Sequence, residues 1–346
     1  MSRWLCALAF ACLWAASAAP AAAAGEGSPK PFCPPPAATP DLSPAALTRA
    51  MQQAVDRGLL WRIEKDGRSS WLYGTMHLGK AEWMVPGPRV LRALMQSDTL
   101  ALELDLLDPA TLAVFSAPAD AAASARVLTP ERQRRLDRQA AAACLPQGAL
   151  ARLRPILQVT TLSMLAARSE GLYGDYGSEA FLAGLARARG KPIVALESAA
   201  DQLRMLGGDS EAEEGEQVDQ ALDELESGHV GALAGELAQA WARNDWPRLD
   251  SYLQWCDCVR TPADRRALKR LLDDRNPGLA DGIARLHARG RRVFGAVGAL
   301  HMVGPTGLPA LLAARGFRVT AVVPAAAASP SVRAEPVEAG APPPRR

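Results

Sequence analysis

Two short motifs of the form Gly-x-x-His lie near opposite ends of the chain, and each follows an apolar run. The first is Gly74–His77 and the second is Gly298–His301. A glycine has no Cβ atom, so it lets the backbone turn sharply and approach a ligand closely just before the imidazole. Neutral imidazoles are common ligands of divalent metals. Because the chain has only four histidines, the paired motifs predict a metal site.

Two glutamates also stand at the ends of short apolar runs, between the two motifs. They are Glu103 and Glu197. Two imidazoles with one or two carboxylates form a ligand set that suits zinc, manganese or cobalt and leaves one position open for water. We therefore expect His77, His301 and Glu103 as metal ligands. Taken alone, each residue also has an ordinary structural role, as a hydrogen-bonded histidine or as an acid at a helix N-terminus.

The runs that carry these residues predict the elements that position them. Near-continuous apolar strands separated by long helical stretches are typical of a mainly parallel sheet that helices cover on both faces. The expected strands are Thr99–Leu104, Ile193–Leu196, Val293–Val297 and Phe317–Val323. Functional groups of such sheets gather at the carboxyl ends of the strands. One rim is therefore expected to collect the two histidines and the two glutamates.

A hairpin and further helices complete the expected fold. Asp66-Gly67 suits a two-residue type I′ turn between strands Leu60–Lys65 and Arg68–Tyr73. The acidic segment Glu211–Glu226 has apolar residues at helical spacing, which predicts a helix with a solvated acidic face. The predicted fold class is α/β, with a mainly parallel central sheet, an N-terminal β-hairpin, flanking helices and a helical insertion or cap.

The two ends of the chain differ in composition from its centre. Residues 1–24 have Arg3 before an apolar stretch and end in small residues, which is typical of a cleaved export signal. Residues 25–45 are rich in proline and alanine and predict an extended linker, and residues 325–346 predict a disordered tail. The α/β body then spans 46–324. We expect a periplasmic or secreted protein with no stable membrane insertion after signal cleavage.

The charge balance argues against nucleic acid as a partner. The formal net charge is +2, and charged residues of both signs are interspersed along the chain. A surface that binds nucleic acid needs clustered Lys and Arg side chains. Hydrophobic residues make up 49% of the chain, which is enough for a sizeable core.

Four cysteines remain once the export signal is removed, and an exported protein can oxidise them. They are Cys33, Cys144, Cys256 and Cys258. Cys256 and Cys258 stand too close in sequence to pair comfortably, so we expect each to pair with Cys33 or Cys144. Two connectivities stay open. A Cys-x-Cys metal site is the alternative, although no His or Cys partners at zinc-site spacing lie nearby.

Several motifs together resemble the TraB/PrgY/GumN family, which is related to the Tiki metalloproteases and more remotely resembles the erythromycin esterases. The motifs are YGTMHLG, LALELD, ALES, DDRNPGLADGI and AVGALHMVGPTGLPALLAARGFRV. The resemblance covers Leu59–Val323. Its end motifs are specific and occur in the order typical of the family, whereas the helical middle is only loosely matched.

The resemblance implies a site as well as a fold. In that superfamily the two Gly-x-x-His motifs and a strand-end glutamate form a metal-dependent active site, which corresponds here to His77, His301 and Glu103. Glu197 matches a second glutamate position, and Arg275 in DRN matches a recurrent arginine. The planar guanidinium of Arg275 suits a carboxylate or a developing oxyanion, and the alternative is an ion pair at the start of a helix.

These residues predict a metal-dependent hydrolase that acts on a peptide, amide or ester bond. A divalent manganese, cobalt or zinc ion would lower the pKa of a bound water. Glu103 would serve as the third ligand or as a base, Glu197 would accept the water proton, and Arg275 would steady the oxyanion. The expected partner is a peptide or small-molecule substrate.

Two other function classes remain open. A non-catalytic envelope protein would use the same rim to hold a metal, haem or a small ligand, and it would need no general base. A redox or envelope-assembly factor would use Cys256 and Cys258 as a reactive thiol pair. Glu103→Gln and Glu197→Gln separate the hydrolase from the binding protein, because only the hydrolase would lose turnover.

Overall fold

A six-stranded sheet forms the centre of the molecule. The computed structural model describes residues 33–259 and 261–323, and within them the strand order is β4-β3-β5-β2-β1-β6. The strands are β1 (Leu60–Lys65), β2 (Arg68–Thr75), β3 (Thr99–Leu102), β4 (Ile193–Ala195), β5 (Val293–Gly298) and β6 (Arg318–Val323). The pairs β3–β4, β3–β5 and β2–β5 are parallel, and β1 pairs antiparallel with β2 and β6. The predicted mainly parallel sheet with a hairpin is confirmed, and its boundaries differ from the prediction by one or two residues.

The hairpin turn has the backbone that the sequence predicts. Asp66 and Gly67 have φ values of 52° and 71°, and a type I′ turn requires positive φ at both of these positions. β2 continues to Thr75, two residues beyond the predicted end, because its last residues pair with β5. This extension leads the chain directly to His77.

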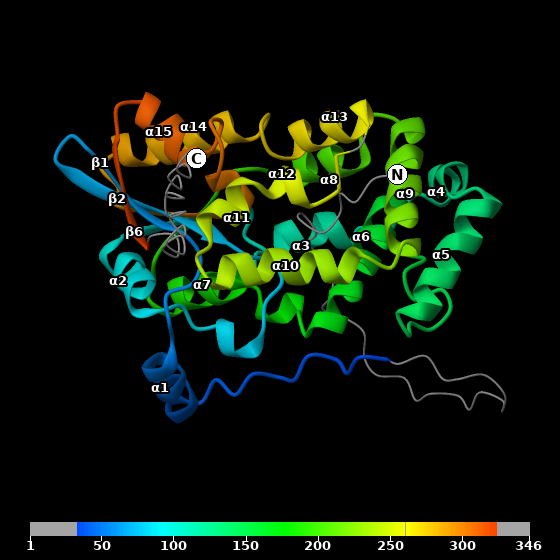
Figure 1. The fold of residues 1–346 in the computed structure, drawn as a ribbon, viewed down its shortest axis with the longest axis horizontal. Helices are drawn as coiled ribbons and strands as arrows, with labels where there is room; N and C mark the ends of the chain where they lie inside the picture. The colour runs from blue at the N-terminus through cyan, green and yellow to red at the C-terminus, as the bar shows by residue number, and fades with distance from the viewer. Residues whose placement is uncertain (1–32, 260, 324–346) are drawn as a thin grey trace, which may run out of the picture.

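Helices cover both faces of the sheet, as predicted. On one face α14 (Asn276–Ala288) contacts β5 and α15 (Leu308–Ala314) contacts β6. On the other face lie α2 (Pro88–Gln96), which contacts β2, and α7 (Ser178–Ala188), which contacts β3 and β4 (Figure 1). Neighbouring residues of β2 show the alternation: Leu72 packs into the first core and Tyr73 into the second.

A helical insertion extends from the sheet on the right of Figure 1 and has α9 (Glu211–Glu226) at its centre. The remaining α-helices after the hairpin are α3 (Pro109–Ser116), α4 (Ala121–Val127), α5 (Pro130–Ala142), α6 (Pro155–Ala166), α8 (Ala199–Gly207), α10 (Val230–Ala242), α11 (Trp246–Asp250), α12 (Tyr252–Trp255) and α13 (Pro262–Leu271). The 3-10 turns are η2 (Ala81–Trp83), η3 (Ala167–Glu170), η4 (Gly174–Tyr176) and η5 (Ala299–Met302). Before β1, α1 (Pro44–Gln53) ends the extended segment that the proline content predicts.

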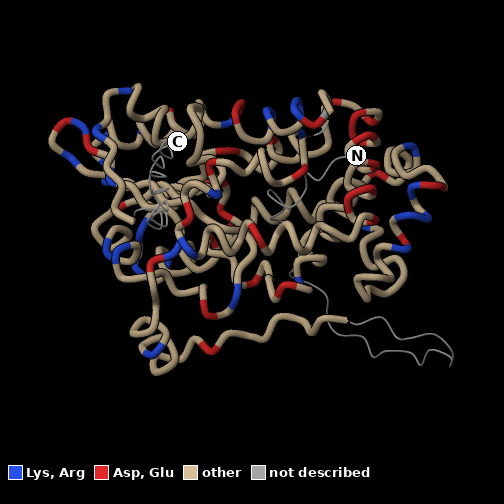
Figure 2. The backbone as a smooth tube through the Cα atoms, viewed as in Figure 1, with Lys and Arg blue, Asp and Glu red and all other residues tan. Residues whose placement is uncertain are grey.

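The acidic face of α9 is paired with arginines, where the sequence predicted a solvated face. The helix itself has the predicted bounds, and its apolar residues, such as Val218, are buried. Arg132 binds Asp219 through two nitrogens, and Arg135 binds Asp223 and Glu226. Figure 2 shows this acidic helix beside the basic residues of α5. The prediction was incomplete because pairing between helices distant in sequence leaves no local signal.

The predicted disulfide connectivity is wrong. Cys33 pairs with Cys144, and Cys256 pairs with Cys258. The second bridge forms because Asp257 has a φ of 50°, a left-handed conformation that reverses the chain. The Cα atoms of its two cysteines are thereby 5.0 Å apart, within the usual range for a disulfide.

Some expectations concern segments beyond the part of the chain that the structure describes. The export signal, the first part of the linker and the C-terminal tail lie outside residues 33–259 and 261–323. Within those residues, none of the helices combines the length and the apolar composition needed to cross a bilayer.

The first Gly-x-x-His motif packs directly against the second through Gly74. A Cβ atom built on Gly74 would lie 3.2 Å from the Cα of Ala299 and 3.3 Å from the Cγ of Met302, both in η5. The carbonyl of Gly74 accepts a hydrogen bond of 2.8 Å from the indole of Trp241. This glycine is therefore needed for close approach between the two motifs and not for a positive φ. The sequence instead predicts close approach to a ligand.

Gly74→Ala is expected to lower the free energy of unfolding by about 1–3 kcal/mol, because the added methyl group overpacks the contact with η5. Urea denaturation measures this change. The matched control is Gly278→Ala in α14, where an added Cβ meets no atom within 4 Å. The control should be neutral or stabilising by up to about 1 kcal/mol, and equal destabilisation of both variants would contradict the packing argument.

Candidate functional site

The expected rim exists, and all four strand-end residues lie on it. β2, β5, β3 and β4 are parallel neighbours, so their carboxyl ends share one edge of the sheet. His77 follows β2 and His301 follows β5 within η5; Glu103 follows β3 directly. Glu197 lies two residues after β4, and its amide donates a hydrogen bond of 3.1 Å to the carbonyl of Glu103.

Arg275 joins the two glutamates. Its Nε and Nη2 donate to the two carboxylate oxygens of Glu197 at 2.8 and 2.6 Å, and Nη2 also binds Oε2 of Glu103. The third nitrogen, Nη1, donates to the carbonyl of Leu271 at 3.0 Å. Arg275 is nine-tenths buried, and these ion pairs raise its pKa despite the desolvation that burial causes. Arg275 thus holds two carboxylates from the N-terminus of α14, so its contacts fit both the carboxylate role and the alternative of an ion pair at a helix start.

Glu103 is ionised although it is buried. Burial alone would raise the pKa of its carboxyl, but the positive charge of Arg275 outweighs this effect and holds the pKa far below its ordinary value. Its other oxygen, Oε1, accepts a hydrogen bond of 2.7 Å from the amide of Gly298. A Cβ on Gly298 would lie 3.2 Å from the same oxygen, so the second motif also needs its glycine for close approach.

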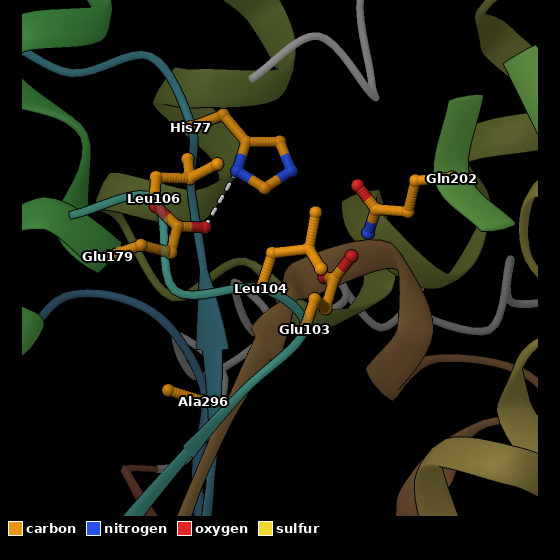
Figure 3. A pocket seen from close by; sticks show the side chains of 7 residues that line it. All are labelled: His77, Glu103, Leu104, Leu106, Glu179, Gln202 and Ala296. Atoms are coloured by element: carbon orange, nitrogen blue, oxygen red, sulfur yellow. Dashed lines mark ion pairs between the residues drawn. The ribbon is translucent and has the colours of Figure 1, made fainter. Parts of the chain in front are cut away.

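His77 has a carboxylate partner that the sequence analysis missed. Its Nδ1 lies 2.7 Å from Oε1 of Glu179, at the start of α7, and both side chains are largely buried (Figure 3). Burial lowers the pKa of the imidazole, but the negative charge of Glu179 more than offsets this, so the pKa of His77 is raised. The Nδ1 proton of a neutral His77 therefore faces Glu179, which puts the lone pair on Nε2.

His301 has a neutral partner. Its Nδ1 lies 2.6 Å from Oδ1 of Asn276, whose amide nitrogen donates to the carbonyl of Thr306 at 2.8 Å. The second bond fixes which end of the amide faces the histidine, so Nδ1 of His301 must be the donor. Its Nε2 then has the lone pair, and this buried atom has no hydrogen-bond partner among the described residues. Burial and the charge of Arg275 lower the pKa of His301 to about 3.

A small cavity of about 30 Å³ lies between His77 and Glu103. Its lining combines charged and apolar side chains (Figure 3). They are His77, Glu103, Leu104, Leu106, Glu179, Gln202 and Ala296. A space of this size with several polar groups is large enough for a water molecule but not for a substrate.

The donor atoms fit a divalent metal in kind. Both imidazoles have Nδ1 fixed against an oxygen, which is the usual arrangement of metal-binding histidines, and Nε2 of His301 is buried without a hydrogen bond. The third expected ligand is engaged, because both oxygens of Glu103 already accept hydrogen bonds. The described residues contain no group of three His, Cys, Asp or Glu side chains arranged to hold a metal. Each carboxylate oxygen of Glu103 has a second lone pair, so Glu103 could coordinate a metal and keep its hydrogen bonds.

Three residues of the site were not identified from the sequence, for different reasons. Glu179 opens a helix, where an acid is ordinary, and only the packing of α7 against the sheet brings it to His77. Asn276 directly follows Arg275, and this adjacency was the one available signal. Gln202 lies on α8 and donates to Oε2 of Glu197 at 3.0 Å. Nothing in its local sequence indicates that role.

Comparison with known proteins identifies a family. The model of the TraB/PrgY/gumN family matches residues 59–321, which is well over half of the chain and includes every residue of the rim. No curated protein and no solved structure matches the chain.

The lowered pKa of His301 predicts an acid-sensitive fold. Between pH 6.5 and about 3, His301 is protonated in the unfolded chain but stays neutral in the folded protein. The stability due to neutral His301 is thus complete above pH 6.5 and is lost as the pH falls, by up to about 1.4 kcal/mol per pH unit. Urea denaturation of chelator-treated protein across this range measures the slope.

His301→Gln should reduce that slope by about one proton, whatever its effect on stability at neutral pH. His229→Gln is the control, because His229 is exposed and far from the rim in sequence. A slope that His301→Gln leaves unchanged would show that His301 is not the group that resists protonation.

Proposed function

The chain belongs to the TraB/PrgY/gumN family, and we propose that its rim is a metal-dependent hydrolase site for a peptide, amide or ester bond. The observation that carries the proposal is the matched pair of histidines. Each has Nδ1 held by an oxygen, from Glu179 and from Asn276, so each directs Nε2 as a potential ligand. Beside them lies Glu103, buried and ionised.

The metal would be held by His77 and His301, with Glu103 as the candidate third ligand or base. A bound manganese, cobalt or zinc ion supplies Lewis acidity, which lowers the pKa of water and polarises a carbonyl group. Charge supports a cation here. Glu103, Glu179 and Glu197 bring three carboxylates, and Arg275 is the permanent cation bound between two of them.

Glu103 orients the water and accepts its proton. It borders the cavity that can contain a water, and it is held ionised by Arg275 at neutral pH. Glu197 was expected to accept this proton, but Glu103 lines the cavity and Glu197 is not among its lining residues. Glu197 instead accepts hydrogen bonds from Arg275 and Gln202. We therefore assign Glu197 and Arg275 as positioning residues that fix Glu103.

The surroundings of the rim bear on substrate and location. Leu104 and Leu106 give the cavity an apolar side, which suits a substrate with an uncharged group beside the reacting bond. The carboxylates disfavour an anionic substrate. Two disulfides support function in an oxidising compartment such as the cell envelope or the exterior.

His77→Ala and His301→Ala are each expected to weaken Mn²⁺ binding by more than about 100-fold. Glu179→Gln should weaken it by about 10- to 100-fold, because it removes only the group that orients His77. Isothermal titration calorimetry of chelator-treated protein measures the affinities, with Co²⁺ and Zn²⁺ titrated in parallel. His229→Ala is the control and should bind as the parent does. Unchanged metal content in both histidine variants would exclude the rim as the metal site.

Glu103→Gln is expected to lower turnover by about 10²- to 10⁴-fold, because the uncharged amide cannot accept the water proton. Glu197→Gln should have a smaller effect, since it alters only the support of Glu103. Cleavage of peptide and ester libraries, with and without chelator, measures both variants against the parent. If Glu103→Gln retains full turnover, Glu103 is not the base. If the parent binds metal and cleaves nothing, the chain is a binding protein.

A further inference from the structure

The segment Cys33–Leu42, which we call the arm, crosses the molecular surface before α1. Its anchor is the disulfide between Cys33 and Cys144, which spans 111 residues of sequence. Most of its residues are exposed, and it includes four prolines, at 34–36 and 40. A proline-rich segment is semi-rigid and extended. Because the arm is stiff, fixing Cys33 by the disulfide also restricts the positions of the residues that follow it.

Two tyrosines bind the backbone of the arm. The hydroxyl of Tyr173 donates to the carbonyl of Pro35 at 3.1 Å, and that of Tyr176 donates to the carbonyl of Ala38 at 2.6 Å. The rings of the two tyrosines pack edge to face, with their centroids 5.6 Å apart. These contacts of the arm thus converge on η4 and its N-cap residue Tyr173, just before α7.

The same turn holds the loop of His77. Tyr173 and Gly79 exchange two backbone hydrogen bonds, of 3.0 and 2.9 Å. A Cβ on Gly79 would lie 2.3 Å from the carbonyl oxygen of Tyr176, so the two backbones are in direct contact. Gly79 stands two residues after His77, which leaves little freedom for the loop to move apart from the turn.

The first turn of α7 also binds the loop that carries His77. The amide of Ser178 donates to the carbonyl of Met76 at 3.0 Å, and the amide of Met76 donates to the hydroxyl of Ser178 at 2.9 Å. The next residue, Glu179, pairs with His77. Tyr176 is therefore three residues from one member of this pair and against the loop that carries the other.

We propose that the arm is a clamp, that Tyr173 and Tyr176 are positioning residues for the His77–Glu179 pair, and that reduction of Cys33–Cys144 loosens it. The hydrogen bonds from Tyr173 and Tyr176 offset only part of the entropy of ordering ten largely exposed residues, and the disulfide fixes one end of the arm. The effect on metal affinity rests on the proposed function, whereas the clamp does not.

The two disulfides differ in access to a reductant. Cys33 is exposed, whereas Cys256 and Cys258 are fully buried. A dithiol attacks the accessible bridge and is itself oxidised to a disulfide by loss of two electrons. Cys33 and Cys144 each gain one electron and one proton and become thiols. The clamp therefore responds to reductant while the buried bridge stays closed.

The first test uses hydrogen exchange of the oxidised full-length mature chain. Cys33→Ser/Cys144→Ser should speed exchange of the amides of Met76, Gly79 and Ser178 by at least about tenfold. Tyr176→Phe should give a smaller increase in the same amides. Ser210→Ala is the control, because it removes a helix cap on the distant α9. Unchanged exchange at these amides in the cysteine double variant would overturn the clamp.

The second test separates the clamp from the proposed function by Mn²⁺ titration of the same proteins. If the clamp holds the site, Mn²⁺ affinity should fall by about tenfold in the cysteine double variant. It should fall by a smaller factor in Tyr176→Phe. Faster exchange with unchanged Mn²⁺ affinity would overturn the positioning role. Faster exchange in a chain whose parent binds no Mn²⁺ would support the clamp and overturn the metal site.

The third test concerns the order of reduction. The parent chain is titrated with dithiothreitol, and the released thiols are alkylated and identified by mass spectrometry. Cys33 and Cys144 should be labelled at lower reductant concentration than Cys256 and Cys258. Earlier or simultaneous labelling of the buried pair would overturn the selective response to reductant.

Discussion

The rim depends on one buried cation, the guanidinium of Arg275, which binds Glu103 and Glu197 at once. Removing these three charged groups from water is costly, and only direct pairing with satisfied hydrogen bonds offsets that cost. The pairing joins the ends of β3 and β4 to the start of α14, three elements far apart in sequence. The parallel sheet sets the two glutamates side by side. Their ion pairs with Arg275 then fix the start of α14 against them. Asn276, the next residue, is thereby brought to His301.

The two halves of the site are alike in backbone and different in charge. Both motifs use a glycine for close approach and a histidine held through Nδ1. The partner of His77 is a carboxylate, which raises the pKa of that imidazole. The partner of His301 is an amide, and with Arg275 nearby its pKa falls to about 3. His301 is therefore neutral at every physiological pH, whereas Glu179 favours the protonated form of His77.

Local patterns in the sequence predicted the helices, the strands and the residues at the strand ends. They did not predict which side chains from separate elements pair with one another. Asp66-Gly67 predicts its own turn, because φ at two adjacent residues decides it. Glu103 was placed on the rim because it follows an apolar run in a parallel sheet. Glu179 was not, since its partner lies about a hundred residues away and its helical position looks ordinary. The cysteine pairing failed for a local reason: a left-handed Asp257 is rare and leaves no composition signal.

Charge balance connects the histidine pair to the glutamates. Glu103, Glu179 and Glu197 are three carboxylates around one permanent cation, Arg275. In a buried site of low dielectric such an excess of negative charge attracts a further cation. His301 cannot supply it, because its pKa is too low. A proton on His77 supplies one positive charge, and a divalent ion would supply two. A metal binds only the unprotonated imidazole, and Glu179 raises the pKa of His77, so the proton and the ion would compete for this residue.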